Sequence, residues 1–161
     1  MGVSLMRIAL AAVLFATAMS CGGTSTAATP SPAGLLSNPC GYLSKADFQS
    51  TLGLPLEGYR AGQACGYRDA RGNTCQVTVL ADTGQYTASK EAASRYGVVE
   101  NLGAGDKSFY SAQVQSPGVW IFDLGLMKGA AFASALCGAR FGSSNPKPQA
   151  ARLGSLIASR L

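Results

Sequence analysis

The residue type with the clearest chemical potential in this chain of 161 residues is cysteine, which occurs five times, whereas histidine is absent. Without an imidazole, neither a Ser-His-Asp nor a Cys-His arrangement can form, and histidine-ligated metal sites are excluded as well. No serine lies in a Gly-x-Ser-x-Gly motif, the signature of a nucleophile elbow. The sequence therefore predicts a protein without a catalytic residue, a metal or another cofactor.

Cys21 follows an apolar run over residues 8–19, a layout typical of a secretory signal peptide. A run of about a dozen residues is too short for a transmembrane helix, which needs about 20. The segment AMSC, which ends on Cys21, is similar to the lipobox of bacterial lipoproteins, whose cysteine is acylated before the chain is cut; an ordinary secreted protein is the alternative. We expect residues 1–20 to be removed and Cys21 to anchor the protein at the extracytoplasmic face of the cell membrane, because two acyl chains anchor stably.

The four other cysteines would be exported into an oxidising compartment, where thiols pair, and four cysteines allow three connectivities. We favour Cys40 with Cys65 and Cys75 with Cys137, because each bond would then tie one terminal element to a central hairpin. A zinc site built from all four is the rival interpretation. The chain has no Cys-x-x-Cys motif, which disfavours that site.

The eight carboxylates lie apart in the sequence, so a pair suited to glycoside hydrolysis could arise only through the fold. Asp123 differs from the others because it interrupts an apolar strand, and its alternation opposite Trp120 and Phe122 favours an outward or edge position. In Gly103-Ala104-Gly105-Asp106 the third glycine of a dinucleotide-binding motif is replaced by Ser108. We therefore expect a glycine turn before a strand.

The aromatic residues Trp120, Phe122 and Phe109 are candidates for the hydrophobic core. If the sheet leaves a concave side without a helix, the same residues would line an apolar pocket of the kind that holds a lipid or another small hydrophobic ligand. The sequence leaves both alternatives open.

The paired cysteines, the carboxylates and the aromatic residues all lie in the segment 39–161, which must position them. This segment is long enough for one domain with a modest core. Residues 21–38 comprise the lipidated cysteine and a flexible tether of Gly, Ser, Thr, Ala and Pro, in which O-glycosylation and an unmodified spacer are both open. The domain has twelve cations and eight anions, a net charge of +4. No basic cluster is interleaved with aromatics, so we expect no nucleic acid partner, but a mild attraction to anionic membrane surfaces or wall polymers.

Three segments carry helix signals. Residues 45–52 follow Ser44, which is expected to cap the helix while Asp47 returns the hydrogen bond. The segment YTASKEAASRYG predicts a second helix that ends at Gly97. A C-terminal helix begins after Asn145 and has one apolar face. That face consists of Ala150, Leu153, Leu156, Ile157 and Leu161.

Strands are indicated by the alternating segments TCQVTVLA and VWIFDLGL, each preceded by a turn and a further strand segment, ACGYRD and SFYSAQVQ respectively. The segment AAFASALCG is consistent with a strand or a short helix. We predict a single small α+β domain with two disulfides. Its antiparallel sheet of about four to five strands is packed by N-terminal, middle and C-terminal helices.

Four short motifs together resemble an actinobacterial, mycobacterial-type family of cell-envelope lipoproteins of unknown function. They are Asn38-Pro39-Cys40, the capped helix LSKADFQSTLG, Cys65-Gly66-Tyr67, and Gly103-Ala104-Gly105-Asp106 ahead of Phe109. The resemblance covers residues 38–161; it departs from the family at Gly66, which separates the cysteine from the aromatic residue, and in the additional Cys75 and Cys137. It implies an α+β lipoprotein domain without a known activity.

The sequence is therefore consistent with three functions. The first is a membrane-anchored, non-catalytic binding or interaction module that meets an envelope protein or another envelope component. The second is a carrier that holds a hydrophobic or lipid ligand in an apolar pocket. The third and weaker alternative is a carboxylate-based hydrolase of wall glycans.

Overall fold

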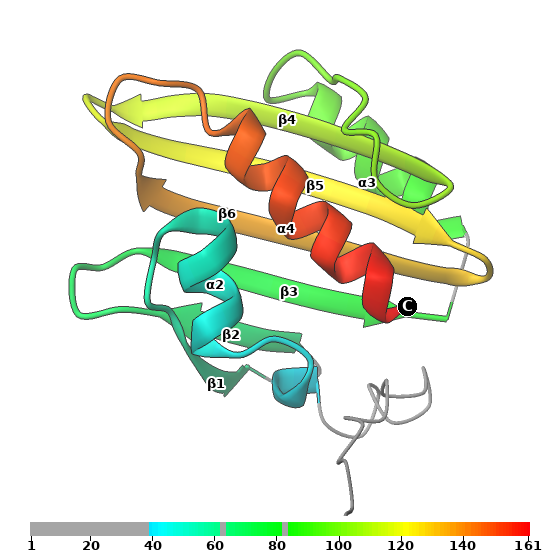
Figure 1. Ribbon diagram of the computed structural model, residues 1–161. Helices are drawn as coiled ribbons and strands as arrows, with labels where there is room; N and C mark the ends of the chain where they lie inside the picture. Colours follow the sequence, from blue (N-terminus) through cyan, green and yellow to red (C-terminus); the bar gives the residue numbers. More distant parts are fainter. Residues whose placement is uncertain (1–38, 62–63, 82–83) are drawn as a thin grey trace, which may run out of the picture.

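The structure is a computed structural model that describes residues 39–61, 64–81 and 84–161. The expected signal peptide, Cys21 and the tether lie outside the described residues. A six-stranded antiparallel sheet forms the centre of the domain, with the strand order β1-β2-β3-β6-β5-β4 (Figure 1). The strands are β1 (Glu57–Ala61), β2 (Ala64–Arg68), β3 (Thr74–Leu80), β4 (Lys107–Ser116), β5 (Val119–Lys128) and β6 (Ala131–Arg140).

The helices cover the two faces of the sheet unequally. Helices α2 (Lys45–Leu52) and α4 (Lys147–Arg160) lie side by side on one face, whereas α3 (Gly84–Ser94) lies on the other face behind β4 and β5 (Figure 1). A 3-10 turn, η1 (Pro39–Gly41), precedes α2. None of the helices in the described residues is long and apolar enough to cross a membrane.

The hydrophobic core lies between the sheet and the pair α2 and α4. Alternate residues of the central strands point into it, among them Val77 and Leu124, and the buried face of α4 contributes Leu153 and Ile157. Fully burying a side chain of this size stabilises the fold by about 1.5–3 kcal/mol. The apolar face that the sequence predicts for the C-terminal helix is therefore the face that packs on the sheet.

Both predicted disulfides are confirmed. Cys40 in η1 is bonded to Cys65 in β2, and Cys75 in β3 is bonded to Cys137 in β6. Cys75 and Cys137 are directly opposite each other in the antiparallel register of the two strands. The first bond ties the beginning of the domain to the sheet, and the second joins two central strands that are far apart in sequence.

The N-terminal helix begins and ends where the sequence predicts. Ser44 accepts a hydrogen bond from the backbone of Asp47, whose carboxylate accepts one from the Ser44 backbone at 2.6 Å, so the capping box is complete. Gly53 ends the helix in a left-handed conformation at φ 74°. Helix α3 ends at Ser94 rather than Gly97, because the backbone N–H groups of Arg95 and Tyr96 bond to carbonyls three residues back and form a turn.

The sheet has one strand more than the upper limit of the prediction. The additional strand, β1, is exposed along its whole length at the edge of the sheet, so it lacks the apolar alternation by which strands are recognised in sequence. The ambiguous segment AAFASALCG belongs to β6, which pairs on both sides with β3 and β5. The expected glycine turn before β4 is also present, with Gly103 and Gly105 at positive φ.

Candidate functional site on the open face of the sheet

The face of the sheet that carries α3 is only partly covered. Tyr86 of α3 packs edge-on against Phe109 and Phe132, with ring centroids 5.7 and 6.5 Å apart. In the part of the chain that the structure describes, no helix lies over β1, β2 and β3 on this side (Figure 1). We call this uncovered side the open face.

One row of directly paired residues crosses all six strands on the open face. From β1 to β4 the row consists of Tyr59, Gly66, Gln76, Leu136, Asp123 and Ser111. Because directly opposite residues in an antiparallel sheet share a face, these side chains all point away from α2 and α4. Leu136 is 52% exposed in the middle of the row. Hollows lie on both sides of it.

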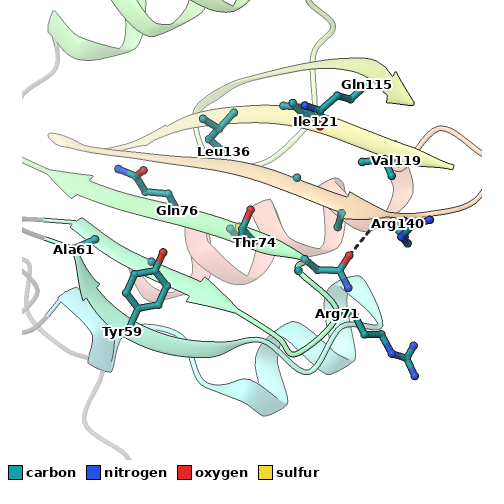
Figure 2. A pocket seen from close by; sticks show the side chains of 16 residues that line it. Tyr59, Ala61, Arg71, Thr74, Gln76, Gln115, Val119, Ile121, Leu136 and Arg140 are labelled. Carbon is teal, nitrogen blue, oxygen red and sulfur yellow. Dashed lines mark hydrogen bonds between the residues drawn. The ribbon is translucent and has the colours of Figure 1, made fainter. Parts of the chain in front are cut away.

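The larger of these two hollows, here called the basic hollow, has a volume of about 500 Å³ and extends from β1 across β2, β3, β6 and β5 to Gln115 near the end of β4 (Figure 2). Its lining combines the aromatic Tyr59, the amide residues Gln76 and Gln115, and two arginines, Arg140 and Arg71, of which Arg71 lies at the edge with its side chain directed away from the others (Figure 2). None of its lining residues is a carboxylate. The hollow therefore offers hydrogen-bond donors and positive charge to a ligand.

Two glycines shape the floor of the basic hollow in different ways. A Cβ atom on Gly66 would lie 2.4 Å from Cζ of Tyr59, so the Tyr59 ring lies directly across β2 at this glycine. The Arg68 guanidinium is 5.0 Å from the centroid of the same ring, within the range of a cation–π contact. At Gly138 the nearest atom to an added Cβ is Oγ1 of Thr74 at 3.6 Å, so the floor has free space there.

The turn between β2 and β3 holds the edge of the basic hollow in place. Asp69 accepts hydrogen bonds from the backbone of Arg71 at 2.8 Å and of Asn73 at 3.0 Å. Asn73 in turn accepts one from the backbone of Arg140 at 2.9 Å. Burial raises the pKa of Asp69, but the hydrogen bonds from Asn73 and Arg71 outweigh it and lower the pKa overall. Neither Arg71 nor Arg140 takes part in an ion pair among the described residues, so both guanidinium groups are available to a ligand.

The smaller hollow, here called the acidic groove, has a volume of about 280 Å³ and lies between the C-terminal end of α3 and strands β4, β5 and β6. Asp123 is the one carboxylate that lines it. Burial raises the pKa of Asp123 to about 6. The sequence placed Asp123 in an outward or edge position; it does point away from Phe122, but β5 is an interior strand and the carboxylate is half-buried.

The aromatic residues proposed from sequence as pocket-lining do not come together. Phe122 is fully buried beneath α4, whereas Phe109 is fully buried on the opposite face beneath Tyr86. Trp120 is half-buried and donates a hydrogen bond from Nε1 to the carbonyl of Gly142 at 3.0 Å. None of the three lines either hollow of the open face. Strand alternation puts Phe109 and Phe122 on different faces, and helices cover both.

The residues that form the two hollows lack a recognisable signal in the sequence, apart from Asp123. Tyr59 lies on the strand that the sequence did not predict, and Gln76 and Arg140 are typical residues of any solvent-facing strand. Among the described residues there is no group of three or more His, Cys, Asp or Glu side chains that could hold a metal ion. The chain matches no described protein family, no curated protein and no solved structure.

Proposed function

We propose that this protein is a non-catalytic binding module of the cell envelope, held at the outer face of the cytoplasmic membrane by lipidated Cys21. The basic hollow on the open face is the proposed binding site. One observation carries this proposal: half of a sheet face is without a helix, and it has a hollow of about 500 Å³ whose lining includes two arginine residues and no carboxylate. Exposed concave surfaces with a few convergent polar groups are typical of binding sites.

The ligand that we propose for the basic hollow is an anionic, hydroxyl-rich envelope glycan. Guanidinium groups bind carboxylate or phosphate oxygens in a two-point geometry, which suits Arg71 and Arg140. The amides of Gln76 and Gln115 both donate and accept hydrogen bonds, as hydroxyl groups require. Tyr59 is 43% exposed and offers an apolar ring surface. The net charge of +4 on residues 39–161 would favour the approach of such a polymer.

The two other functions weighed from the sequence are less well supported. A carrier would need an enclosed apolar pocket, but the aromatic residues proposed for it are packed in the interior or paired with backbone. A glycan hydrolase would need two carboxylates facing one cleft, and Asp123 is the one carboxylate lining either hollow of the open face. Two other hollows have two carboxylates each in their lining, but Glu57 and Glu100 are paired with lysines, and Asp69 and Asp106 accept hydrogen bonds from backbone N–H groups. Neither function is therefore proposed.

The membrane anchor is tested by replacing Cys21 with Ala and following the protein in cell fractions. We expect the wild-type protein in the membrane fraction and the C21A variant in the medium, because the acyl chains are the proposed attachment. Retention of the variant in the membrane fraction would contradict lipidation at Cys21. It would not contradict the proposed binding site, which is tested separately.

The binding site is tested with the C21A protein and two polymers, polygalacturonate and neutral dextran. We expect binding to polygalacturonate that weakens with added salt, and at least tenfold weaker binding to dextran. A ring placed in the hollow by Gly138→Phe should weaken polygalacturonate binding at least tenfold, while the Gly138→Ala variant, which has room for its methyl group, should bind like the parent protein.

Two charge-removing variants separate an effect of the basic hollow on polymer binding from an effect of the net charge. Arg140→Gln removes a cation that lines the basic hollow, whereas Lys90→Gln removes an exposed cation on α3. We expect R140Q to weaken binding at least fivefold and K90Q to leave it unchanged. Equal effects of the two variants would mean that the polymer responds only to net charge and would overturn the proposed site.

A further inference from the structure

The acidic groove differs from the basic hollow in charge and in lining. Its walls come from small and apolar side chains, Ala92 and Ala93 on α3 and Ile121 and Leu136 on the sheet. The carboxylate of Asp123 is the only acidic group among the lining residues. The groove therefore combines an apolar wall with a single negative charge.

Asp123 has no structural partner that explains its position. No hydrogen bond or ion pair joins its carboxylate to any residue in the described ranges, and the neighbouring Ser111 hydroxyl donates instead to the carbonyl of Ala93, at 3.4 Å. A carboxylate that is partly withdrawn from water without a protein partner costs free energy, and groups with a pKa shifted in this way are concentrated at functional sites. The raised pKa of Asp123, about 6, reflects this burial and leaves the group mostly ionised at pH 7.5.

We propose that the acidic groove binds a protonated amine carried on a short aliphatic body. The carboxylate of Asp123 would pair with the ammonium group, and the walls formed by Ala92, Ala93 and Ile121 would cover the aliphatic part. Tyr96, which also lines the groove and is 68% exposed, supplies an aromatic face to a cation. The acidic groove adjoins the proposed glycan site at Ile121 and Leu136, which line both, but it would select a ligand of opposite charge.

The size of the groove limits the ligand. A volume of about 280 Å³ lies at the lower end of the range of about 300–1,000 Å³ that is common for small-molecule sites. An amine on a chain of about four to six carbons therefore fits better than a long-chain lipid. The same chemistry is found in a free alkylamine and in the side chain of a lysine residue.

The experiment measures binding of n-hexylammonium to the C21A protein by calorimetry, with hexanoate as the probe of opposite charge. We expect n-hexylammonium to bind and hexanoate to bind at least tenfold more weakly. Asp123→Asn, which keeps the shape of the side chain, should weaken n-hexylammonium binding at least tenfold. Glu91→Gln, which removes an exposed carboxylate from α3, is the matched control and should have no effect.

The pH dependence gives a second readout. Asp123 and Tyr96 are the titratable residues that line the groove, and the charged residues Lys90, Glu91 and Arg95 of the adjoining helical segment do not line it. Binding should therefore weaken about tenfold between pH 7.5 and pH 5 as the Asp123 carboxylate takes up a proton. Equal binding of n-hexylammonium and hexanoate, an equal loss in D123N and E91Q, or binding independent of pH would each overturn the proposal.

The source of the amine is distinguished in the same assay with N-acetyl-lysine amide. Tighter binding of N-acetyl-lysine amide than of n-hexylammonium would assign the groove to a lysine side chain of a partner protein. Tighter binding of n-hexylammonium would assign it to a free amine. Both results support an ammonium site, whereas the failure of both probes to bind would refute it.

Discussion

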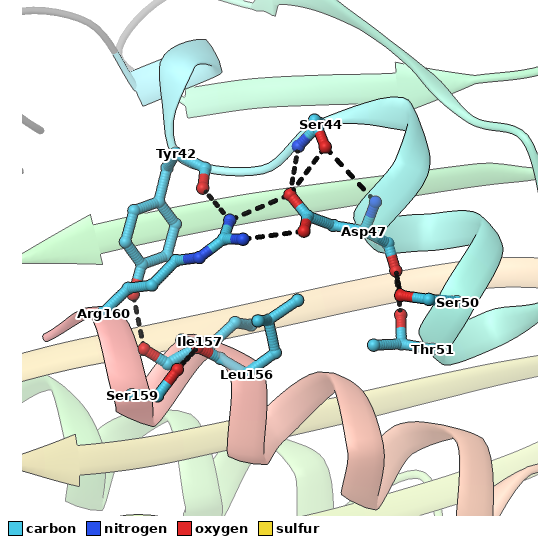
Figure 3. Close-up of polar contacts among 9 residues, drawn as sticks. All are labelled: Tyr42, Ser44, Asp47, Ser50, Thr51, Leu156, Ile157, Ser159 and Arg160. Carbon is cyan, nitrogen blue, oxygen red and sulfur yellow. Dashed lines mark hydrogen bonds and ion pairs between the residues drawn. The ribbon is translucent and has the colours of Figure 1, made fainter. Parts of the chain in front are cut away.

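The carboxylate of Asp47 and the guanidinium of Arg160 form a two-point ion pair that joins the first long helix of the domain to the last (Figure 3). The N–O distances are 2.9 and 2.7 Å, and the two residues are 113 positions apart in the sequence. Asp47 also completes the capping box of α2, and Arg160 also donates to the carbonyl of Tyr42. Burial raises the pKa of Asp47, but hydrogen bonds from Arg160 and Ser44 outweigh it and lower the pKa to about 2.

Replacing Arg160 with Ala is expected to lower the free energy of unfolding by about 1 to 2 kcal/mol, because a two-point charged contact that is mostly buried contributes more than an exposed ion pair. Urea denaturation measures the change. Lys45→Ala is the control, since the Lys45–Glu57 pair is exposed on both sides, at 57% and 68%. An equal loss of stability in the two variants would show that the Asp47–Arg160 contact has no special role.

Replacing Asp123 with Asn is expected to stabilise the domain at pH 7.5 by about 3 kcal/mol, because one unit of pKa difference corresponds to about 1.4 kcal/mol. The pKa of Asp123 is raised to about 6 in the folded protein, from an ordinary value of 3.8. Between these values the unfolded chain loses the proton before the folded protein does, so the wild-type domain loses stability as the pH rises from about 4 to about 6. Denaturation should show that most of the difference between D123N and wild type is gone at about pH 3, where the carboxyl is protonated in both the folded and the unfolded state. A difference that stays constant from about pH 3 to about pH 7.5 would contradict a buried, unpaired carboxylate.

Removing either disulfide is expected to destabilise the domain substantially. The bonded cysteines are 25 residues apart for Cys40–Cys65 and 62 residues apart for Cys75–Cys137. Without the bond the unfolded chain is less restricted, so replacing both cysteines of a pair with Ala is expected to lower the free energy of unfolding. The expected losses are about 3.5 kcal/mol for Cys40–Cys65 and about 4 kcal/mol for Cys75–Cys137. Denaturation of each double variant checks these values. Peptide mapping without reduction should recover these two linkages, and a cross-linked pair of any other kind would refute the connectivity.

Two glycines on the same face of the sheet should respond oppositely to an added methyl group. A Cβ on Gly125 would lie 2.3 Å from Cε1 of the buried Phe109 ring, so Gly125→Ala is expected to cost about 2 kcal/mol or more. At Gly138 the added Cβ meets only ordinary contacts at 3.6 and 3.8 Å, so Gly138→Ala should leave stability unchanged or raise it slightly. Thermal unfolding of the two variants compares them directly, and an equally stable G125A would show that Phe109 is not tightly packed there.

The sequence by itself determined the elements whose signals are local. The capping box at Ser44 and Asp47 and the stop at Gly53 depend on residues within a few positions of one another, so the bounds of α2 follow from them. The alternation in β3 and β5 likewise identifies both strands, and in β3 it separates the buried Cys75 and Val77 from their exposed neighbours. In β5 it does not predict burial, because residues 124–127 are all buried. The pairing of the four cysteines that the sequence favoured is the one present. Its topological reason holds only for Cys40–Cys65, because Cys137 lies in the central strand β6 and not in a terminal element.

Only the tertiary structure decided which surfaces meet a helix and which stay open. Strand alternation places Phe109 and Phe122 on different faces of the sheet. It does not predict that α4 covers the face of Phe122 or that α3 covers only part of the face of Phe109. Tyr59, Gln76 and Asp123 join one row because strands that are distant in sequence pair in one register. The sequence signals for helices and strands depend on residues within a few positions of one another. The two hollows depend instead on packing between segments up to about 80 positions apart in the chain. That is why the sequence indicated the α+β domain and its disulfides, while the open face and the surroundings of Asp123 required the folded chain.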